Sequence, residues 1–217
     1  MRFDASVTTE LLEGMRQAKQ TIGRAGLIVL PTDTVYGIGC DAFSAFAVTA
    51  LLEAKGRGRQ SPPPVLIPSL DTLRALADNP PEVAFTLAEK FWPGALTMIL
   101  RAQPSLSWDL GETRGTVALR IPNNELALAL LKEVGPLAVS SANLTAQPAA
   151  KSIDEAEMYF GSKVGVYLDG GAAPSAKPST IVDLTESGKV KIVRLGVLTL
   201  AQIKKVVGKD VEVSVAD

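Results

Sequence analysis

Histidine is absent from this sequence of 217 residues, and cysteine occurs once, at Cys40. The missing imidazole excludes a Ser-His-Asp triad, a Cys-His pair and a histidine metal site. A single cysteine excludes an internal disulfide and a cysteine-rich zinc site. Any chemistry must therefore use lysine, arginine, serine, threonine, carboxylates and backbone groups.

An excess of one charge and a long apolar run are also missing. Lysine and arginine number 22 against 23 acidic residues, for a formal net charge of -1. This balance excludes a chain-wide basic surface for nucleic acid. No stretch approaches the roughly 20 apolar residues that span a membrane, and the N-terminus is too polar for a signal peptide. We therefore expect a cytoplasmic protein with no membrane contact.

The remaining pattern predicts a single α/β domain with one sizeable core, because 47% of the residues are hydrophobic. Helical spacing predicts helices over residues 8–25, 44–54, 69–77, 81–91, 125–133, 152–160 and 200–207. Short β-forming runs predict strands over residues 26–31, 65–68, 95–100, 116–122, 136–143 and 164–171, and a hairpin from 179–185 and 189–196. The expected fold is a twisted, mixed open sheet with flanking helices over residues 1–208, followed by a C-terminal tail over 209–217 that forms a short frayed strand.

Two segments carry polar groups in patterns typical of ligand sites, and the first of them lies at a strand end, where ligands of α/β sheets bind. Residues 31–39, PTDTVYGIG, follow a buried strand and present two threonine hydroxyls. Residues 55–64, KGRGRQSPPP, form a loop with three cations spaced by glycines, a composition compatible with phosphate binding. The alternatives are an ordinary strand-to-helix turn capped by Asp33, and a solvated basic loop.

Three further segments carry the same kinds of groups. Thr116 and Arg120 lie four apart on one strand and so share a face, where a buried arginine needs an anionic ligand or an internal carboxylate. Residues 138–143, AVSSAN, end a strand with hydroxyls and an amide that favour an anion, or else form a cap or turn. Residues 178–183 and 193–196 add hydroxyls and an arginine, unless these are surface groups. Together these segments favour binding of a polyanion such as a nucleotide over hydrolytic chemistry.

The ordered strings PTDTVYGIG, KGR, FWPGALT, TVALRIP, SSAN, DGG and STIVDLT resemble the threonylcarbamoyl-AMP synthases of the TsaC/YrdC family over residues 27–196. The resemblance implies a YrdC-like sheet with a deep concave cavity. It also implies synthesis of threonylcarbamoyl-AMP from L-threonine, bicarbonate and ATP, with release of pyrophosphate. The product would serve threonylcarbamoyl-adenosine modification of tRNA next to the anticodon.

Site residues are implied by the same resemblance. The L-threonine site would comprise Thr32, Thr34, Arg120 and Ser179. The ATP site would comprise Lys55, Arg57, Ser61, Thr116, Ser141, Asn143 and Arg194, with Lys55 and Arg57 as the catalytic pair on the triphosphate. Mg²⁺ is expected to be held mainly by the ATP phosphates, with no metal site made of side chains. Partners would be downstream tRNA threonylcarbamoyl transferase proteins, with tRNA bound only weakly or indirectly.

The sequence departs from the family pattern in three places: QSPPP after the basic motif, LTAQPAA after SSAN, and Arg194-Leu195-Gly196 in place of R-P-G. The chain is expected to be the short form, without the extra C-terminal domain of longer members. Two other functions stay open: a double-stranded RNA or tRNA-binding module without catalysis, and a carbamoyl-handling domain of a maturation enzyme. A steep salt dependence of RNA affinity would indicate the first.

Overall fold

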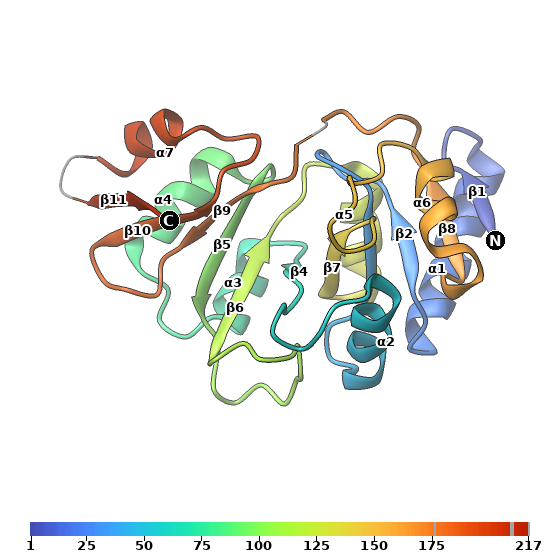
Figure 1. The fold of residues 1–217 in the computed structure, drawn as a ribbon, viewed down its shortest axis with the longest axis horizontal. Helices are drawn as coiled ribbons and strands as arrows, with labels where there is room; N and C mark the ends of the chain where they lie inside the picture. The colour runs from blue at the N-terminus through green and yellow to red at the C-terminus, as the bar shows by residue number, and fades with distance from the viewer. Residues whose placement is uncertain (176, 209–210, 217) are drawn as a thin grey trace.

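One mixed sheet of eleven strands organises this computed structural model, which describes residues 1–175, 177–208 and 211–216 (Figure 1). The strand order is β1-β8-β2-β3-β7-β4-β6-β5-β9-β10-β11. The strands span Arg2–Asp4 (β1), Ile28–Leu30 (β2), Gly37–Asp41 (β3), Val65–Leu66 (β4), Leu96–Arg101 (β5), Thr116–Arg120 (β6), Leu137–Ser141 (β7), Val166–Asp169 (β8), Thr180–Asp183 (β9), Lys189–Arg194 (β10) and Glu212–Val215 (β11).

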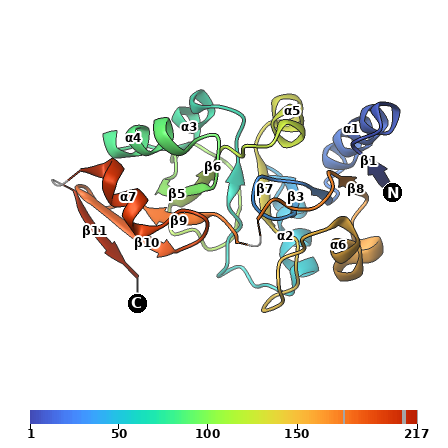
Figure 2. The same ribbon diagram turned by 90° about the horizontal axis from the view of Figure 1, so that it is seen from above.

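Helices cover both faces of this sheet. They span Thr8–Gly23 (α1), Ala45–Lys55 (α2), Leu70–Leu76 (α3), Glu82–Phe91 (α4), Glu125–Val134 (α5), Ile153–Phe160 (α6) and Leu200–Val207 (α7), with a 3₁₀ turn at Gly161–Lys163. Figure 2 shows α1, α3, α4 and α5 on one side of the sheet and α2 and α6 on the other. The fold therefore matches the predicted α/β class with a mixed sheet and flanking helices.

Around β7 the two-residue period of the strand separates two apolar clusters. On β7, Leu137 and Val139 join the cluster formed with α1 and α5, whereas Ala138 faces the larger cluster that includes α2 and α6. This alternation arises because successive side chains of a strand point to opposite faces. Ser140 and Ser141 end β7 with hydroxyl groups in place of apolar side chains.

Strand β3 was not predicted, because its sequence GIGCD resembles a glycine-rich turn. It lies between β2 and β7 and pairs antiparallel with both. Gly37 is required there by close approach, since an added Cβ would lie 2.6 Å from Val139 Cγ1. Asp33 does not cap the following helix as the turn alternative supposed, because Ser44 caps α2.

Other boundaries also differ from the sequence predictions. Strand β1 was not predicted; it pairs parallel with β8. The predicted hairpin is confirmed as the antiparallel pair β9–β10. Within the predicted tail, β11 pairs parallel with β10, while residues 209, 210 and 217 lie outside the described residues. The division at residue 208 stays a prediction. In the described part of the chain, no helix is long and apolar enough to cross a membrane.

Candidate active site

A cavity of about 270 Å³ opens where the middle strands of the sheet meet, and residues of β3, β7, β6, β5, β9 and β10 line it. Its charged lining residues are Arg57, Arg120 and Arg194, and none of the described residues in its wall is acidic. Threonine and serine hydroxyls and apolar side chains complete the wall. Against these three cations stands one carboxylate just outside the wall, that of Asp33, which pairs with Arg120. The remaining positive charge favours an anionic ligand.

Eight of the residues predicted from sequence lie in this wall. They are Thr32, Thr34, Arg57, Thr116, Arg120, Ser141, Ser179 and Arg194. The predicted alternation of β6 is therefore confirmed, because Thr116 and Arg120 face the same cavity. The other three predicted residues, Lys55, Ser61 and Asn143, are not in the wall.

Arg120 lines the cavity and also forms a buried ion pair. Its Nη2 donates to Asp33 Oδ1 over 2.6 Å, its Nη1 to Thr34 Oγ1 over 3.1 Å, and its Nε to the carbonyl of Gly94 over 2.9 Å. Burial lowers the pKa of Arg120 and the Asp33 carboxylate raises it, but a guanidinium stays charged in either case. The internal ion pair left open by the sequence is present, and it holds the guanidinium in place at the cavity wall.

The threonines of PTDTVYG form a tight turn around this arginine. The Thr32 hydroxyl donates to the Val35 carbonyl over 2.6 Å and accepts from the Thr34 N–H over 3.1 Å. The Thr34 hydroxyl lies 3.0 Å from that of Thr32 and accepts from Arg120. Both threonines are at most 5% exposed, so their hydroxyls are held in one orientation.

A second polar group is centred on Ser179, just before β9. Its hydroxyl lies 2.8 Å from the hydroxyl of Thr97 on β5, and its carbonyl accepts from Arg194 Nη2 over 2.8 Å. The ladder between β9 and β10 shifts register between Ile192 and Arg194, which is the kind of irregularity that re-aims a side chain. This explains how an arginine at the end of β10 reaches the cavity.

Arg194 is the cavity arginine whose pKa reflects the charges of the other two. Burial lowers the pKa of Arg194, and Arg120 and Arg57 lower it further. An anion placed among the three would offset this repulsion. The third cation, Arg57, follows Gly56, whose left-handed backbone (φ +64°) ends α2 abruptly. Arg57 Nη1 then donates to the Ser140 hydroxyl over 3.2 Å.

Comparison with known proteins decides the family. The Sua5/YciO/YrdC family model, described as "Telomere recombination", matches residues 20–196. The chain belongs to the Sua5/YciO/YrdC family. A Mycobacterium leprae relative is 48% identical over 206 residues, which is 95% of this chain and 93% of that protein. The Bacillus subtilis protein named threonylcarbamoyl-AMP synthase is 36% identical over 95% of this chain and 61% of its own length.

Solved structures of the Sua5/YciO/YrdC family show the same fold. The structure of Pyrococcus abyssi Sua5 complexed with L-threonine matches 98% of this chain and 62% of its own, with a TM-score of 0.89 and 33% identity. Escherichia coli YciO matches 88% of this chain and 92% of its own, with a TM-score of 0.77 and 28% identity.

The three predicted family-motif residues outside the wall have other contacts. Lys55 is the last residue of α2, not a loop residue, and its Nζ donates to the carbonyls of Ser141 and Asn143. Asn143 Nδ2 donates to the carbonyls of Leu144 and Gln147, so this amide shapes the turn after β7. Ser61 donates its backbone N–H to the Gly58 carbonyl.

The departures from the family pattern are accommodated locally. In QSPPP, Pro62, Pro63 and Pro64 form part of the cavity wall. After Arg194, the glycine of the Arg-Leu-Gly turn is packed closely, since an added Cβ at Gly196 would lie 2.1 Å from the Pro178 carbonyl oxygen. In the wall the prolines place rigid, apolar surface beside the arginines.

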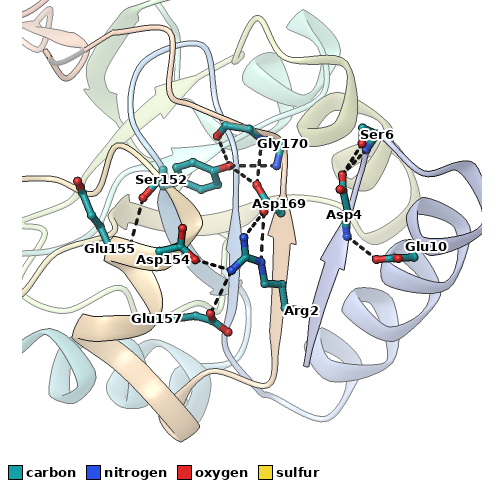
Figure 3. Close-up of polar contacts among 12 residues, drawn as sticks. Arg2, Asp4, Ser6, Glu10, Ser152, Asp154, Glu155, Glu157, Asp169 and Gly170 are labelled. Atoms are coloured by element: carbon teal, nitrogen blue, oxygen red, sulfur yellow. Dashed lines mark hydrogen bonds and ion pairs between the residues drawn. The ribbon is translucent and has the colours of Figure 1, made fainter.

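Four polar wall residues were not among the site residues named from the sequence: Tyr36, Thr97, Thr113 and Ser140. Tyr36 is fully buried, and its hydroxyl donates to the Gly171 carbonyl over 2.6 Å and accepts from the Gly170 N–H over 3.0 Å. The Asp169 carboxylate contacts both the Tyr36 hydroxyl and Arg2 on β1. Arg2 in turn forms ion pairs with Asp154 and Glu157 of α6 (Figure 3). Tyr36 lies in PTDTVYG and Thr97 ends FWPGALT, so both lie in motif strings, although no role was assigned to either.

Proposed function

We propose that this protein is a threonylcarbamoyl-AMP synthase, which converts L-threonine, bicarbonate and ATP into threonylcarbamoyl-AMP and pyrophosphate. The observation that carries the proposal is the cavity in which three arginines and several fixed hydroxyls converge without a carboxylate in the described wall. A histidine-free site of this kind can position and neutralise phosphates but offers no imidazole for proton transfer. The named activity of the B. subtilis relative and the L-threonine bound by P. abyssi Sua5 support the same reaction.

In this proposal Thr32, Thr34, Arg120 and Ser179 bind L-threonine. Arg120 already uses three of its five N–H groups on Asp33, Thr34 and Gly94. One N–H remains on each terminal nitrogen, and this pair can bind the threonine carboxylate as a fork. The hydroxyls of Thr34 and Ser179 are then available to the substrate side chain and amine.

The nucleotide would lie against the other cations. Arg57 and Arg194 neutralise the triphosphate, and Thr116 and Ser141 offer hydroxyls from neighbouring strands. Lys55, Ser61 and Asn143 would support this site from behind the wall. Their predicted direct contact with ATP has no counterpart in the described cavity lining.

The chemistry needs positioning more than covalent help from the protein. The threonine amine attacks bicarbonate to give a carbamate and water, and a carbamate oxygen then attacks the α-phosphorus as pyrophosphate leaves. The charge that develops on the leaving group is balanced by the arginines. Arg57 is the proposed catalytic residue, because its guanidinium would stabilise the negative charge that develops on the leaving pyrophosphate.

Magnesium is proposed to enter with ATP rather than to be held by side chains. The described residues contain no cluster of three or more potential metal-ligating side chains. The carboxylate nearest the substrate arginine, Asp33, is occupied by that arginine. Phosphate oxygens and water would therefore supply the ligands, as is usual for Mg²⁺ bound with a nucleotide.

The product would be passed to tRNA threonylcarbamoyl transferase proteins, and the cytoplasm is the proposed location for this tRNA modification. Direct tRNA contact would be weak, since the net charge of -1 offers few phosphate contacts.

Pyrophosphate release from ATP tests the proposal directly. We expect release that requires both L-threonine and bicarbonate, with threonylcarbamoyl-AMP identified by mass spectrometry. Release without L-threonine, or tight salt-dependent RNA binding in the absence of any pyrophosphate release, would contradict it.

A further inference from the structure

Lys55 is joined to the turn after β7 by four hydrogen bonds. Its Nζ donates to the carbonyls of Ser141 and Asn143, the latter over 2.7 Å. Its own carbonyl accepts from the N–H of Thr145 over 3.1 Å and from the Thr145 hydroxyl over 2.9 Å. The end of α2 and residues 141–145 are therefore held together as one unit. This unit includes the end of β7, where Ser140 and Ser141 line the cavity.

The amine is buried without a carboxylate partner. Lys55 is 1% exposed, and none of the ion pairs among the described residues involves it. Residues 136–150, which supply its acceptors, contain no charged residue. The cation is thus stabilised only by carbonyl dipoles, which is a costly arrangement for a full charge.

The titratable groups of β3, on which α2 packs, do not change this balance. Asp41 pairs with Leu137 at the opposite end of β7 from Ser141, roughly 13 Å away at 3.3 Å per residue. The Cys40 thiol stays neutral, because burial raises its pKa to about 12.

The charge that acts on the amine is Arg57, two residues along the chain. Burial lowers the pKa of Lys55 to about 7, and repulsion from Arg57 contributes to the decrease. A triphosphate beside Arg57 would offset this repulsion and attract the ammonium form. The protonated amine also makes stronger hydrogen bonds to the two carbonyls than the neutral amine does.

We propose that Lys55 is a positioning residue that takes up a proton when a nucleoside triphosphate binds beside Arg57, and that the charged amine then secures the end of β7, which carries the Ser141 hydroxyl. This inference rests on the proposed function, since it needs ATP in the arginine-lined cavity. It requires no direct contact between Lys55 and phosphate. Nucleotide affinity should consequently depend on pH although the chain has no histidine.

Calorimetric titration with MgATP at pH 8 tests this coupling. Binding heats measured in two buffers of different ionisation enthalpy give the number of protons taken up. A group of pKa about 7 is roughly 10% protonated at pH 8, so wild-type protein should take up a substantial fraction of a proton, at most about 0.9, per nucleotide. The ATP phosphates are already deprotonated at this pH and contribute little.

Lys55→Met removes the amine and keeps the length of the side chain. Lys90→Met, at an exposed position in α4, is the matched control. We expect proton uptake to disappear in Lys55→Met and to persist in the control. The KM for ATP should rise about tenfold in Lys55→Met, while the KM for L-threonine changes less than twofold.

Binding of ATP by wild-type protein at pH 8 without proton uptake would overturn the inference, as would uptake retained in Lys55→Met. The wild-type measurement decides the matter even if Lys55→Met does not fold. A wild-type protein that binds no ATP at all would instead overturn the proposed function, and this inference with it.

Discussion

Replacing Arg120 by lysine separates substrate binding from structural support at one position. The guanidinium bonds to Asp33, Thr34 and Gly94, and it is only 7% exposed. Lysine keeps the positive charge near Asp33, so the carboxylate is not left unpaired. It cannot offer two parallel N–H groups to a substrate carboxylate as well.

The size of the effect follows from the bonds that lysine loses. One hydrogen bond to a charged group contributes about 1.5–3 kcal/mol. Loss of one of the two hydrogen bonds to the threonine carboxylate should therefore lower kcat/KM for L-threonine by about 10- to 150-fold. The KM for ATP should change less than threefold, because the proposed triphosphate ligands Arg57 and Arg194 are untouched. The melting temperature should fall as well, since the bonds to Gly94 and Thr34 are lost.

Steady-state pyrophosphate release with each substrate varied in turn measures these constants, and calorimetry gives the melting temperature. Arg101→Lys, at an exposed position on the neighbouring β5, is the matched control and should behave as wild type. A variant that melts earlier but keeps the wild-type KM for L-threonine would refute the carboxylate fork. Arg120 would then serve only as the partner of Asp33.

Four further results are expected. Arg57→Ala should lower pyrophosphate release by about 100-fold, as removal of an electrostatic donor does, with little change in the circular dichroism spectrum; normal turnover would contradict the role of Arg57. L-Threonine should be preferred over serine by about 1–3 kcal/mol and over valine by more, as competition assays would show, whereas equal use would remove Thr34 and Ser179 from the substrate site. Thr97→Val should raise the KM for L-threonine about 2- to 10-fold by removing the hydroxyl 2.8 Å from Ser179 Oγ, and Thr97→Ser should restore it. The free energy of unfolding in urea should rise from pH 7 to pH 10 more steeply in wild type than in Lys55→Met, because the unfolded lysine binds a proton there that the folded one has lost; parallel profiles would contradict the lowered pKa of Lys55.

Local sequence was sufficient for much of the fold, and the family motifs indicated eight of the polar and charged residues of the cavity wall. Helical spacing located the seven α-helices found among the described residues, and the alternation of β6 placed Thr116 and Arg120 on one face. Composition excluded histidine and disulfide chemistry outright. These inferences succeed because the periods of helices and strands and the availability of reactive groups are properties of the chain itself.

Strand β3 shows where local pattern misleads. Its glycines are typical of turns, yet Gly37 lies inside the sheet because a neighbouring strand leaves no room for a Cβ. The same holds for Thr97, which is polar on an apolar strand and gains its meaning only from Ser179, 82 residues away. Contacts between distant segments override local propensity.

Lys55 is the clearest case in which the sequence indicated one position for a side chain and the structure shows another. Its place beside two glycines and two further cations indicated a phosphate ligand in a loop. Only the packing of α2 against the turn after β7 shows that the amine lies behind the wall, on the carbonyls of Ser141 and Asn143. The residue type determines that a titratable amine is available. The tertiary structure determines where that amine lies, and burial and neighbouring charges then set its pKa.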